Sequence, residues 1–244
     1  MKQSIFTICQ NEALTKDVYR MVLEGDTSAI TAPGQFVNIQ LSGKFLRRPI
    51  SVCDWDERTL TLIYKVVGHG TQVMSAMVPG EKLDILTGLG NGYDLSLAGD
   101  CPVLIGGGVG VPPLYGAVKK LTQMGIRCSV ILGFNTGAEV FCEEQFRALG
   151  CDVQVTTVDG SYGIKGFVTD ALNMDYTYFY TCGPEPMLKA VYRATNTSGQ
   201  MSFEERMGCG FGACMGCSCR TITGYKRICK EGPVMRKEEI LWEA

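Results

Sequence analysis

The chain has 244 residues, of which 45% are hydrophobic and 20% are charged, and its formal net charge is −2. This composition is typical of a globular protein with two or three small domains, and the weak negative charge provides no basic face for nucleic acid. No apolar run is long enough to cross a membrane, and the N-terminal residues lack the layout of a signal peptide. We therefore expect a cytoplasmic protein that binds neither nucleic acid nor a membrane.

The counts of two residue types narrow the chemistry further. Twelve cysteines are present, and in a chain of this size without a secretory signal we expect them to be reduced rather than paired in disulfides. His69 is the only histidine in the sequence, so histidine-based acid–base or nucleophilic catalysis is poorly supported. Hydride transfer between two bound cofactors needs no acid or base from the protein, and it fits this composition.

Residues 1–98 contain short segments, several of which alternate apolar and polar residues as half-buried antiparallel strands do. Turn residues such as Pro33-Gly34 and Pro79-Gly80 separate them, and one short helix is expected after Gly70-Thr71, through Met77. Six short strands and one helix predict a small closed barrel. The expected strands are Ile5–Cys9, Val18–Leu23, Gln35–Leu41, Pro49–Cys53, Leu60–Val67 and Lys82–Leu86.

From Gly99 to about residue 199 the pattern changes to strands that alternate with helices. Such alternation predicts a parallel sheet built from right-handed βαβ units. The expected strands are Pro102–Ile105, Arg127–Phe134, Asp152–Thr157 and Tyr176–Cys182. The expected helices are Pro112–Met124, Ala138–Leu149, Gly166–Leu172 and Pro184–Ala194.

The last part of the chain, residues 200–244, follows an expected linker at Asn196–Gly199 and begins with many glycines and cysteines. It is too small for a large hydrophobic core, and a metal centre would supply the missing order. Cys209, Cys214 and Cys217 have the C-x4-C-x2-C spacing of plant-type [2Fe–2S] sites, which take a fourth cysteine elsewhere in the chain. This spacing predicts a centre that moves one electron at a time.

Two cysteines compete for the fourth ligand position. Cys229 is preferred, because Cys219 lies only two residues after Cys217 and would be strained at a different iron. The alternative metal is a structural zinc ion with four cysteine ligands, but zinc ribbons usually present two C-x2-C pairs and this chain has one. The spacing therefore favours an iron–sulfur cluster, and a zinc-stabilised interaction module is the alternative from another class.

Two motifs in the central region are weak when each is taken alone. Gly106–Gly110 connects an expected strand to an expected helix, as a phosphate-binding turn does. It departs from the Rossmann fingerprint, however, and a plain strand–helix turn explains it about equally well. Cys182 lies at the end of the last parallel strand, where ligands bind, or it is simply a buried small residue before a helix.

Two motifs in the first region are also ambiguous. Arg47–Ser51 offers an arginine fork that suits a diphosphate, although a solvated charged turn is the more common explanation. Gly68–Thr71 combines a glycine turn with a helix start, so its free N–H groups could bind phosphate or could only be capped by Thr71.

Taken in this order, the motifs resemble the ferredoxin reductase superfamily, in which a flavin-binding barrel precedes a nicotinamide-binding α/β domain. Within it, the chain is most similar to the electron transfer subunits of dihydroorotate dehydrogenase B, over essentially its whole length. The motifs that carry the resemblance are Arg48-Pro-Ile-Ser51, Gly68-x-Gly70-Thr71, Leu89-Gly-Asn-Gly-Tyr93, Gly106–Pro112, Asp159-Gly-Ser-Tyr-Gly163, Thr181-Cys-Gly-Pro184 and Glu204–Cys217.

The resemblance implies a mixed β and α/β fold in three parts. These are an N-terminal antiparallel FAD-binding β-barrel at 1–98, a central parallel α/β NAD-binding domain at 99–199 and a small [2Fe–2S] cluster-binding domain at 200–244. The resemblance also places Arg48 on the FAD pyrophosphate and Ser51 near the isoalloxazine ring. The other FAD-binding residues that it implies are Pro49, Ile50, Ile63, Tyr64, Lys65, Gly70 and Thr71. One departure is Ile50, where the superfamily often has an aromatic residue.

The resemblance assigns the remaining sites as well. The residues implied to bind NAD(H) are Gly106, Gly107, Gly108, Gly110, Cys182 and Gly183, the last two beside the nicotinamide ring. Ser51 and Cys182 are the implied catalytic residues. The implied ligands of the [2Fe–2S] cluster are Cys209, Cys214, Cys217 and Cys229.

The implied function is that of an electron transfer subunit in an NAD-linked flavin and iron–sulfur oxidoreductase. Hydride would pass between NADH and FAD, and single electrons would pass between FAD, the cluster and the FMN of a partner catalytic subunit. In the resembled family this serves dihydroorotate oxidation in pyrimidine (UMP) biosynthesis, in an assembly expected to hold two copies of each subunit. Glu139 follows the second strand of the central region, and no lysine or arginine lies between it and Arg147. Because the 2′-phosphate of NADPH would need a cation, this favours NADH over NADPH. The alternative within this class is the small subunit of a sulfide dehydrogenase or a ferredoxin:NADP reductase complex.

Overall fold

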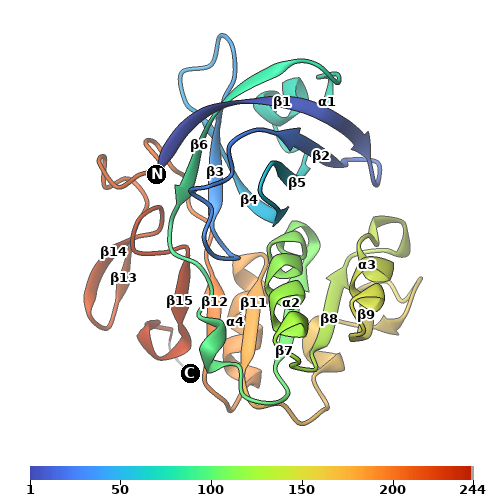
Figure 1. Ribbon diagram of the computed structural model, residues 1–244. Helices are drawn as coiled ribbons and strands as arrows, with labels where there is room; N and C mark the ends of the chain where they lie inside the picture. The colour runs from blue at the N-terminus through green and yellow to red at the C-terminus, as the bar shows by residue number, and fades with distance from the viewer. Residues whose placement is uncertain (243–244) are drawn as a thin grey trace.

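The computed structural model describes residues 1–242, and its N-terminal part is a barrel (Figure 1). The barrel strands are β1 (Lys2–Ala13), β2 (Val18–Glu24), β3 (Phe36–Gln40), β4 (Arg48–Trp55), β5 (Thr59–Lys65) and β6 (Lys82–Leu89). They close in the order β1-β2-β5-β4-β3-β6 with every neighbouring pair antiparallel, and helix α1 (His69–Ser75) connects β5 to β6. The expected barrel is confirmed.

Alternation along β3 gives this strand two different sides. Val37 and Ile39 are fully buried in the core inside the barrel. Phe36 points outward and packs against the C-terminal part of the chain, and the side chain of Asn38 does the same. Because successive side chains of a strand face opposite ways, β3 is both a wall of the barrel and the surface on which the cysteine-rich segment lies.

The part of the fold that follows the barrel is a seven-stranded sheet of order β10-β9-β8-β7-β11-β12-β15. All neighbouring pairs in this sheet are parallel except β12 with β15. Its strands are β7 (Val103–Gly107), β8 (Ser129–Phe134), β9 (Asp152–Thr157), β10 (Ile164–Lys165), β11 (Phe179–Cys182), β12 (Gly199–Ser202) and β15 (Val234–Arg236). Helices α2 (Pro112–Gln123) and α4 (Glu185–Ala194) pack in separate apolar clusters on opposite faces. Within residues 1–242 no helix has the length and apolar character needed to cross a bilayer.

Two of the expected helices are wrong in extent. In place of the helix at 138–149 there is a 3-10 turn at Gly137–Glu139 and then the short helix α3 (Glu143–Ala148). The two are separate because the backbone is extended at Val140 and left-handed at Cys142, with φ of 65°. Residues 166–172 contain only the 3-10 helix Val168–Ala171, which leaves helical geometry at Leu172. Both errors occur where a local backbone turn overrides the apolar pattern.

Two strands from the C-terminal part of the chain extend the sheet of the nucleotide domain. Strand β12 begins at Gly199, the last residue of the expected linker, and pairs with β11, while β15 pairs with β12. Strands β13 (Ser218–Thr221) and β14 (Gly224–Arg227) form a separate hairpin. The cysteine-rich segment is therefore anchored at both ends to the sheet, as Figure 1 shows.

Helix α2 connects the sheet to the barrel. A Cβ atom at Gly116 would lie 3.1 Å from the carbonyl oxygen of Cys53 on β4, so the glycine permits close approach of the two elements. Beside it, Lys119 Nζ lies 2.9 and 2.7 Å from the two carboxylate oxygens of Asp54. Close packing and a charged pair thus hold the strand that carries the arginine motif against the nucleotide domain.

Candidate functional site

The four cysteines expected as cluster ligands lie close to the β13–β14 hairpin. Cys209 and Cys214 are in the loop before it, Cys217 directly precedes β13, and Cys229 follows β14. The loop turns sharply at Gly210, whose φ of 78° is in the left-handed region. Glycine adopts this conformation without steric cost, so the sequence can wrap its cysteines around one point.

Backbone N–H groups in this loop point at the sulfur atoms. Cys209 Sγ accepts hydrogen bonds from the N–H groups of Ala213 at 3.2 Å and Cys214 at 3.4 Å. Cys217 Sγ accepts one from the N–H group of Cys229 at 3.4 Å. Donors aimed at sulfur stabilise the thiolate form, which is the form that binds a metal.

The pKa values of two thiols differ because of their surroundings. Burial raises the pKa of Cys209, but hydrogen bonds from the N–H groups of Phe211 and Cys214 and from the Cys214 thiol outweigh it and lower that pKa to about 6. Burial, together with the neighbouring Cys217 and Cys209, raises the pKa of Cys229 to about 12. Ligation requires thiolates, so metal binding at Cys229 would release a proton.

The four cysteines form two pairs. The N–H group of Cys214 donates to Cys209 Sγ, and the N–H group of Cys229 donates to Cys217 Sγ, each at 3.4 Å. Within residues 1–242, no three His, Cys, Asp or Glu side chains are grouped so as to hold a single metal ion. Two thiol pairs fit a [2Fe–2S] cluster, which has two irons and four cysteine ligands. Cys219, the competing fourth ligand, lies on β13 within the hairpin.

The two pairs differ in their exposure. Cys217 and Cys229 are each only 2% exposed, and they belong to an apolar cluster with Phe36 and Leu89 of the barrel. In the other pair, Cys209 is half-buried against the same cluster and Cys214 is exposed. A redox centre held by these thiols would have one side against the barrel and the other side exposed.

A charged pair holds the cysteine-rich loop in place. Arg227 Nη1 donates to the carbonyl oxygen of Gly212 at 2.7 Å, and Arg227 Nε donates to Glu231 Oε2 at 2.9 Å. Hydrogen bonding to this guanidinium lowers the pKa of Glu231 to about 2. The pair therefore stays ionised at neutral pH and fixes the loop between Cys209 and Cys214.

In the barrel, the structure brings together Arg48, Gly70 and Thr71. The side chain of Arg48 lies across Gly70, where a Cβ atom would be 2.0 Å from Arg48 Nε. Thr71 Oγ1 accepts hydrogen bonds from the N–H groups of Val67 at 3.0 Å and Gly68 at 3.3 Å. A guanidinium therefore lies beside a glycine turn and the start of α1, which is a suitable arrangement for a phosphate group.

The other expected flavin residues lie on β4 and β5. Pro49–Ser51 is half-buried on β4, and Ile63 on β5 packs with residues of the nucleotide domain. Tyr64 faces the opposite way: it is 2% exposed, lies in the barrel core and donates to Asn11 Oδ1 at 3.0 Å. The side chain of Tyr64 is thus separated from those of Ile63 and Lys65, and only its main chain is available to line a flavin.

A narrow cleft joins the barrel to the glycine loop of the nucleotide domain. Lys65 and Asp17 of the barrel line one side and form an ion pair at 3.1 Å. Gly108, Val109 and Glu139 line the other side. The cleft therefore brings together a flavin-motif residue, the phosphate-loop candidate and Glu139, the carboxylate that favours NADH over NADPH.

The ends of β7 and β11 meet at the carboxyl edge of the sheet. Gly106 pairs in register with Cys182, and a Cβ atom at Gly110 would lie 2.2 Å from the Cys182 carbonyl oxygen. A Cβ atom at Gly183 would lie 3.2 Å from the N atom of Gly107. Burial raises the pKa of the Cys182 thiol to about 12, so this thiol is neutral at physiological pH. Ligands of parallel sheets bind at this edge.

Two neighbours of Cys182 had no expected role. Tyr93 is buried and its hydroxyl donates to the Thr181 carbonyl oxygen at 3.2 Å. Ser202, on β12, pairs in register with Cys182 and is also buried. Of these two, only Tyr93 has a sequence signal, because it ends the motif Leu89-Gly-Asn-Gly-Tyr93. Ser202 follows the expected linker, in a segment where no strand was expected.

Two family models match the chain. Residues 104–193 match the oxidoreductase NAD-binding domain, and residues 204–241 match the iron–sulfur cluster binding domain of dihydroorotate dehydrogenase B. A relative from Geobacillus sp. (strain WCH70), named as the electron transfer subunit of dihydroorotate dehydrogenase B (NAD(+)), is 42% identical, with 99% of each chain covered. The chain belongs to the family of dihydroorotate dehydrogenase B electron transfer subunits.

Other members and neighbours agree with this family. The Fusobacterium nucleatum electron transfer subunit is 42% identical over 98% of this chain and 99% of its own length. A solved structure described as the NADH-dependent reduced ferredoxin-NADP oxidoreductase, which performs flavin-based electron bifurcation, matches with a TM-score of 0.87 and 29% identity, over 97% of this chain and 90% of that chain. The expected class, an NAD-linked flavin and iron–sulfur oxidoreductase subunit with FAD, a [2Fe–2S] cluster and NAD(H), is confirmed.

Proposed function

We propose that this chain, an electron transfer subunit by its family, works with an FMN-containing catalytic subunit in the cytoplasmic oxidation of dihydroorotate for pyrimidine (UMP) biosynthesis. The observation that carries the proposal is the packing of Cys217 and Cys229 on Phe36 of the barrel, because Phe36 pairs in register with Ser51 of the flavin motif. Relatives at 42% identity bear the name of this enzyme. We further propose an assembly with two copies of each subunit.

We assign residues 1–98 to FAD. Arg48 would hold the pyrophosphate together with the turn at Gly70 and Thr71, and the absence of space for a Cβ atom at Gly70 supports this assignment. Ser51 would lie near the isoalloxazine ring and is the catalytic candidate of the barrel. The remaining proposed contacts are Pro49, Ile50, Ile63, Lys65 and the main chain of Tyr64.

We assign residues 99–199 to NAD(H). The proposed phosphate-binding residues are Gly106, Gly107, Gly108 and Gly110, and the proposed nicotinamide contacts are Cys182 and Gly183. The neutral thiol of Cys182 would position the ring rather than exchange a proton, since its pKa is about 12. The carboxylate of Glu139 in the cleft favours a ribose hydroxyl over a 2′-phosphate, and therefore NADH over NADPH.

We assign residues 200–244 to the [2Fe–2S] cluster, with Cys209 and Cys214 on one iron and Cys217 and Cys229 on the other. When bound, FAD and NAD(H) would supply hydride exchange, and the [2Fe–2S] cluster would supply one-electron exchange. The described residues form a six-stranded barrel, a seven-stranded sheet and a hairpin. A dihydroorotate site with FMN would therefore belong to the partner subunit.

The division of labour between subunits is tested by adding dihydroorotate to the purified chain and recording flavin absorption. We expect no bleaching by dihydroorotate, whereas NADH should bleach the flavin at once. Bleaching by dihydroorotate should appear when the catalytic subunit is added. Bleaching in its absence would contradict the proposal.

A second candidate is the small subunit of a ferredoxin:NADP reductase complex, which the structural match at a TM-score of 0.87 favours. The two candidates are distinguished by the subunit that co-purifies with the tagged chain from its native cells. An FMN-containing subunit that oxidises dihydroorotate supports the proposal, and a different subunit supports the second candidate. The zinc-stabilised module is tested by the absorption spectrum of the purified chain: flavin and iron–sulfur bands support the proposal, and a colourless protein that contains zinc would contradict it.

A further inference from the structure

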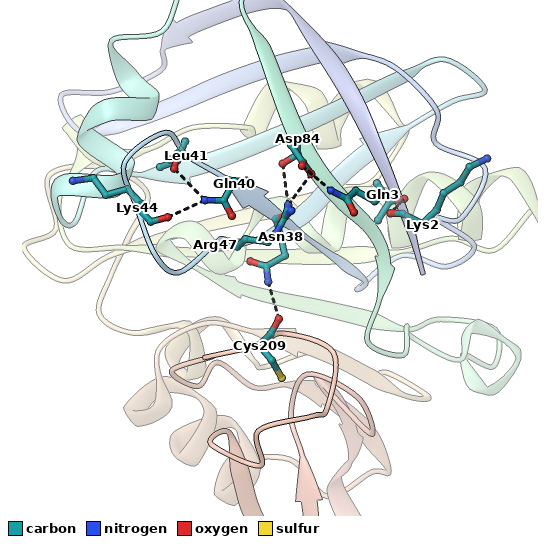
Figure 2. Close-up of polar contacts among 10 residues, drawn as sticks. Lys2, Gln3, Asn38, Gln40, Leu41, Lys44, Arg47, Asp84 and Cys209 are labelled. Atoms are coloured by element: carbon teal, nitrogen blue, oxygen red, sulfur yellow. Dashed lines mark hydrogen bonds and ion pairs between the residues drawn. The ribbon is translucent and has the colours of Figure 1, made fainter.

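One polar side chain connects the flavin barrel directly to the cysteine-rich loop (Figure 2). Asn38, on the outward face of β3, is 1% exposed. Its Nδ2 atom donates a hydrogen bond to the main-chain carbonyl oxygen of Cys209 at 3.3 Å. The contact joins residues 171 positions apart in the sequence, and it reaches the first of the proposed cluster ligands.

The main chain of β3 is fixed at this point by charged groups. Arg47 Nη1 donates to the carbonyl oxygen of Asn38 at 3.3 Å and to Asp84 Oδ1 at 3.0 Å. Gln3 Nε2 donates to the other carboxylate oxygen of Asp84 at 2.7 Å. Figure 2 shows that these groups lie on the barrel side of Asn38, opposite Cys209. The amide of Asn38 therefore extends from a rigid base.

The loop is shaped to receive this amide. A Cβ atom at Gly210, the residue after Cys209, would lie 2.3 Å from Asn38 Nδ2. With a φ of 78°, Gly210 also has the left-handed conformation that turns the loop. The carboxamide thus packs against the main chain of two consecutive loop residues, where no larger residue than glycine fits.

The oxygen atom of the Asn38 carboxamide has no hydrogen-bond partner among the described residues. This atom, Asn38 Oδ1, is buried. An unsatisfied buried oxygen costs stability, and an apolar side chain of the same size would avoid that cost. The amide is therefore better explained by the contact that its nitrogen makes than by packing alone.

Strand register places this contact next to the flavin motif. Asn38 pairs with Pro49 on β4, and its neighbours Ile39 and Val37 pair with Arg48 and Ile50. β3 thus pairs with the proposed FAD strand through its main chain and contacts the loop of Cys209 through the side chain of Asn38. A shift of that loop would change the separation of the two proposed redox groups.

We propose that Asn38 is a positioning residue whose carboxamide fixes the main chain of Cys209, and with it the cluster, against the flavin strand of the barrel. The inference rests on the proposed function. It assigns to Asn38 no contact with a reacting atom; the residue acts through the ligand that it holds. Loss of the donor should slow electron passage from flavin to cluster and leave hydride transfer from NADH to flavin unchanged.

The test uses the complex with its catalytic subunit and compares Asn38→Leu and Asn38→Asp with the wild type. Both variants preserve the size of the side chain, and both remove the N–H donor. Gln40→Leu is the matched control, because Gln40 lies two residues along the same face of β3 and its Nε2 donates only within the turn, to the carbonyl oxygens of Leu41 and Lys44. Iron, sulfide and flavin are counted first. Rapid mixing with NADH then follows flavin bleaching and, by EPR on quenched samples, cluster reduction.

We expect the rate of cluster reduction to fall about tenfold in both Asn38 variants, as the loss of one buried hydrogen bond would give. The EPR signal of the reduced cluster should also change in shape in these variants, while their flavin bleaching stays at the wild-type rate. The Gln40→Leu protein should match the wild type in every measurement. Loss of the cluster alone from both variants, with flavin retained, also supports the proposal, because it shows that the amide holds a ligand.

Two results would overturn the proposal. One is a full complement of cofactors with wild-type EPR signal and cluster reduction rate in both Asn38 variants. The other is loss of flavin and fold together, which would make Asn38 a residue of general stability. A wild-type protein without iron and sulfide would instead refute the proposed function, so the two failures are distinguishable.

Discussion

Phe36 pairs in register with Ser51 across the β3–β4 ladder, and its ring packs in the same apolar cluster as Cys217 and Cys229. One residue therefore touches the proposed cluster pocket with its side chain and the flavin strand with its main chain. The interior of a protein is packed as densely as an organic crystal, so the barrel and the cysteine-rich segment behave as one body at this point.

Shortening Phe36 should loosen the cluster. Phe36→Ala is expected to lower the free energy of unfolding by about 3–5 kcal/mol because it leaves a cavity, and Phe36→Leu by roughly 1 kcal/mol. Both should release iron to a chelator faster than the wild type, in the same order. Phe6→Leu is the control, since Phe6 is fully buried in the barrel core and not in the cluster pocket. Equal iron release from Phe6→Leu and Phe36→Leu would contradict the assignment.

Removing the guanidinium of Arg48 should weaken FAD binding. A hydrogen bond to a charged group is worth about 1.5–3 kcal/mol, so Arg48→Ala should raise the Kd for FAD by about 10- to 100-fold. Equilibrium dialysis of the flavin-free chain with FAD measures this. Arg58→Ala is the control, because that arginine is exposed and paired with Glu24 away from the motif. FAD affinity equal to the wild type in Arg48→Ala would refute the pyrophosphate role.

The choice between Cys229 and Cys219 as fourth ligand can be tested with single substitutions. Cys214→Ser and Cys229→Ser should each abolish the visible absorption of the cluster while FAD stays bound, because each removes one thiolate of a pair. Cys219→Ser should retain the cluster, since Cys219 lies on β13 within the hairpin. The spectra of anaerobically purified proteins show the result, and a cluster that survives Cys214→Ser would exclude this ligand set.

Much of the fold could be predicted because its elements repeat a local pattern. Alternation of apolar and polar residues marks strands such as β3, where Val37 and Ile39 face the barrel core. Strand and helix alternation marks the parallel sheet. The errors occur at single backbone positions: Cys142 takes a left-handed conformation and splits one expected helix, and no residue pattern announces this turn.

The site was less predictable, because its geometry depends on contacts between distant residues. Motifs located the cysteines, the arginine and the glycine loops. Their spacing does not show that the thiols form two pairs, that Tyr64 points into the barrel core, or that Asn38 contacts Cys209. Each of these is fixed by which strands are neighbours, and a linear sequence does not contain that order.

A methyl group at Gly110 should impair NADH binding. It would lie 2.2 Å from the carbonyl oxygen of Cys182, and a backbone atom cannot move aside without shifting the end of β11. We expect Gly110→Ala to raise the KM for NADH about tenfold, because a small misplacement of a binding group has a large kinetic effect. A dye-linked NADH oxidation assay measures it. Gly107→Ala should have a smaller effect, since its methyl group meets the flexible Met187 side chain; an unchanged KM in Gly110→Ala would contradict the proposed site.

The thiol of Cys209 should react at lower pH than an ordinary thiol in the iron-free chain. Although burial opposes ionisation, N–H donors lower the pKa of Cys209 to about 6, whereas the pKa of Cys229 is raised to about 12. Only the thiolate is alkylated. Alkylation of Cys209 by iodoacetamide should therefore rise as the pH passes through about 6 and become constant above neutral pH, while Cys229 reacts slowly throughout the neutral range. Mass spectrometry of the peptides follows both sites. If the rate at Cys209 instead keeps rising up to about pH 8.5, the ordinary pKa of a cysteine, the N–H groups do not stabilise its thiolate.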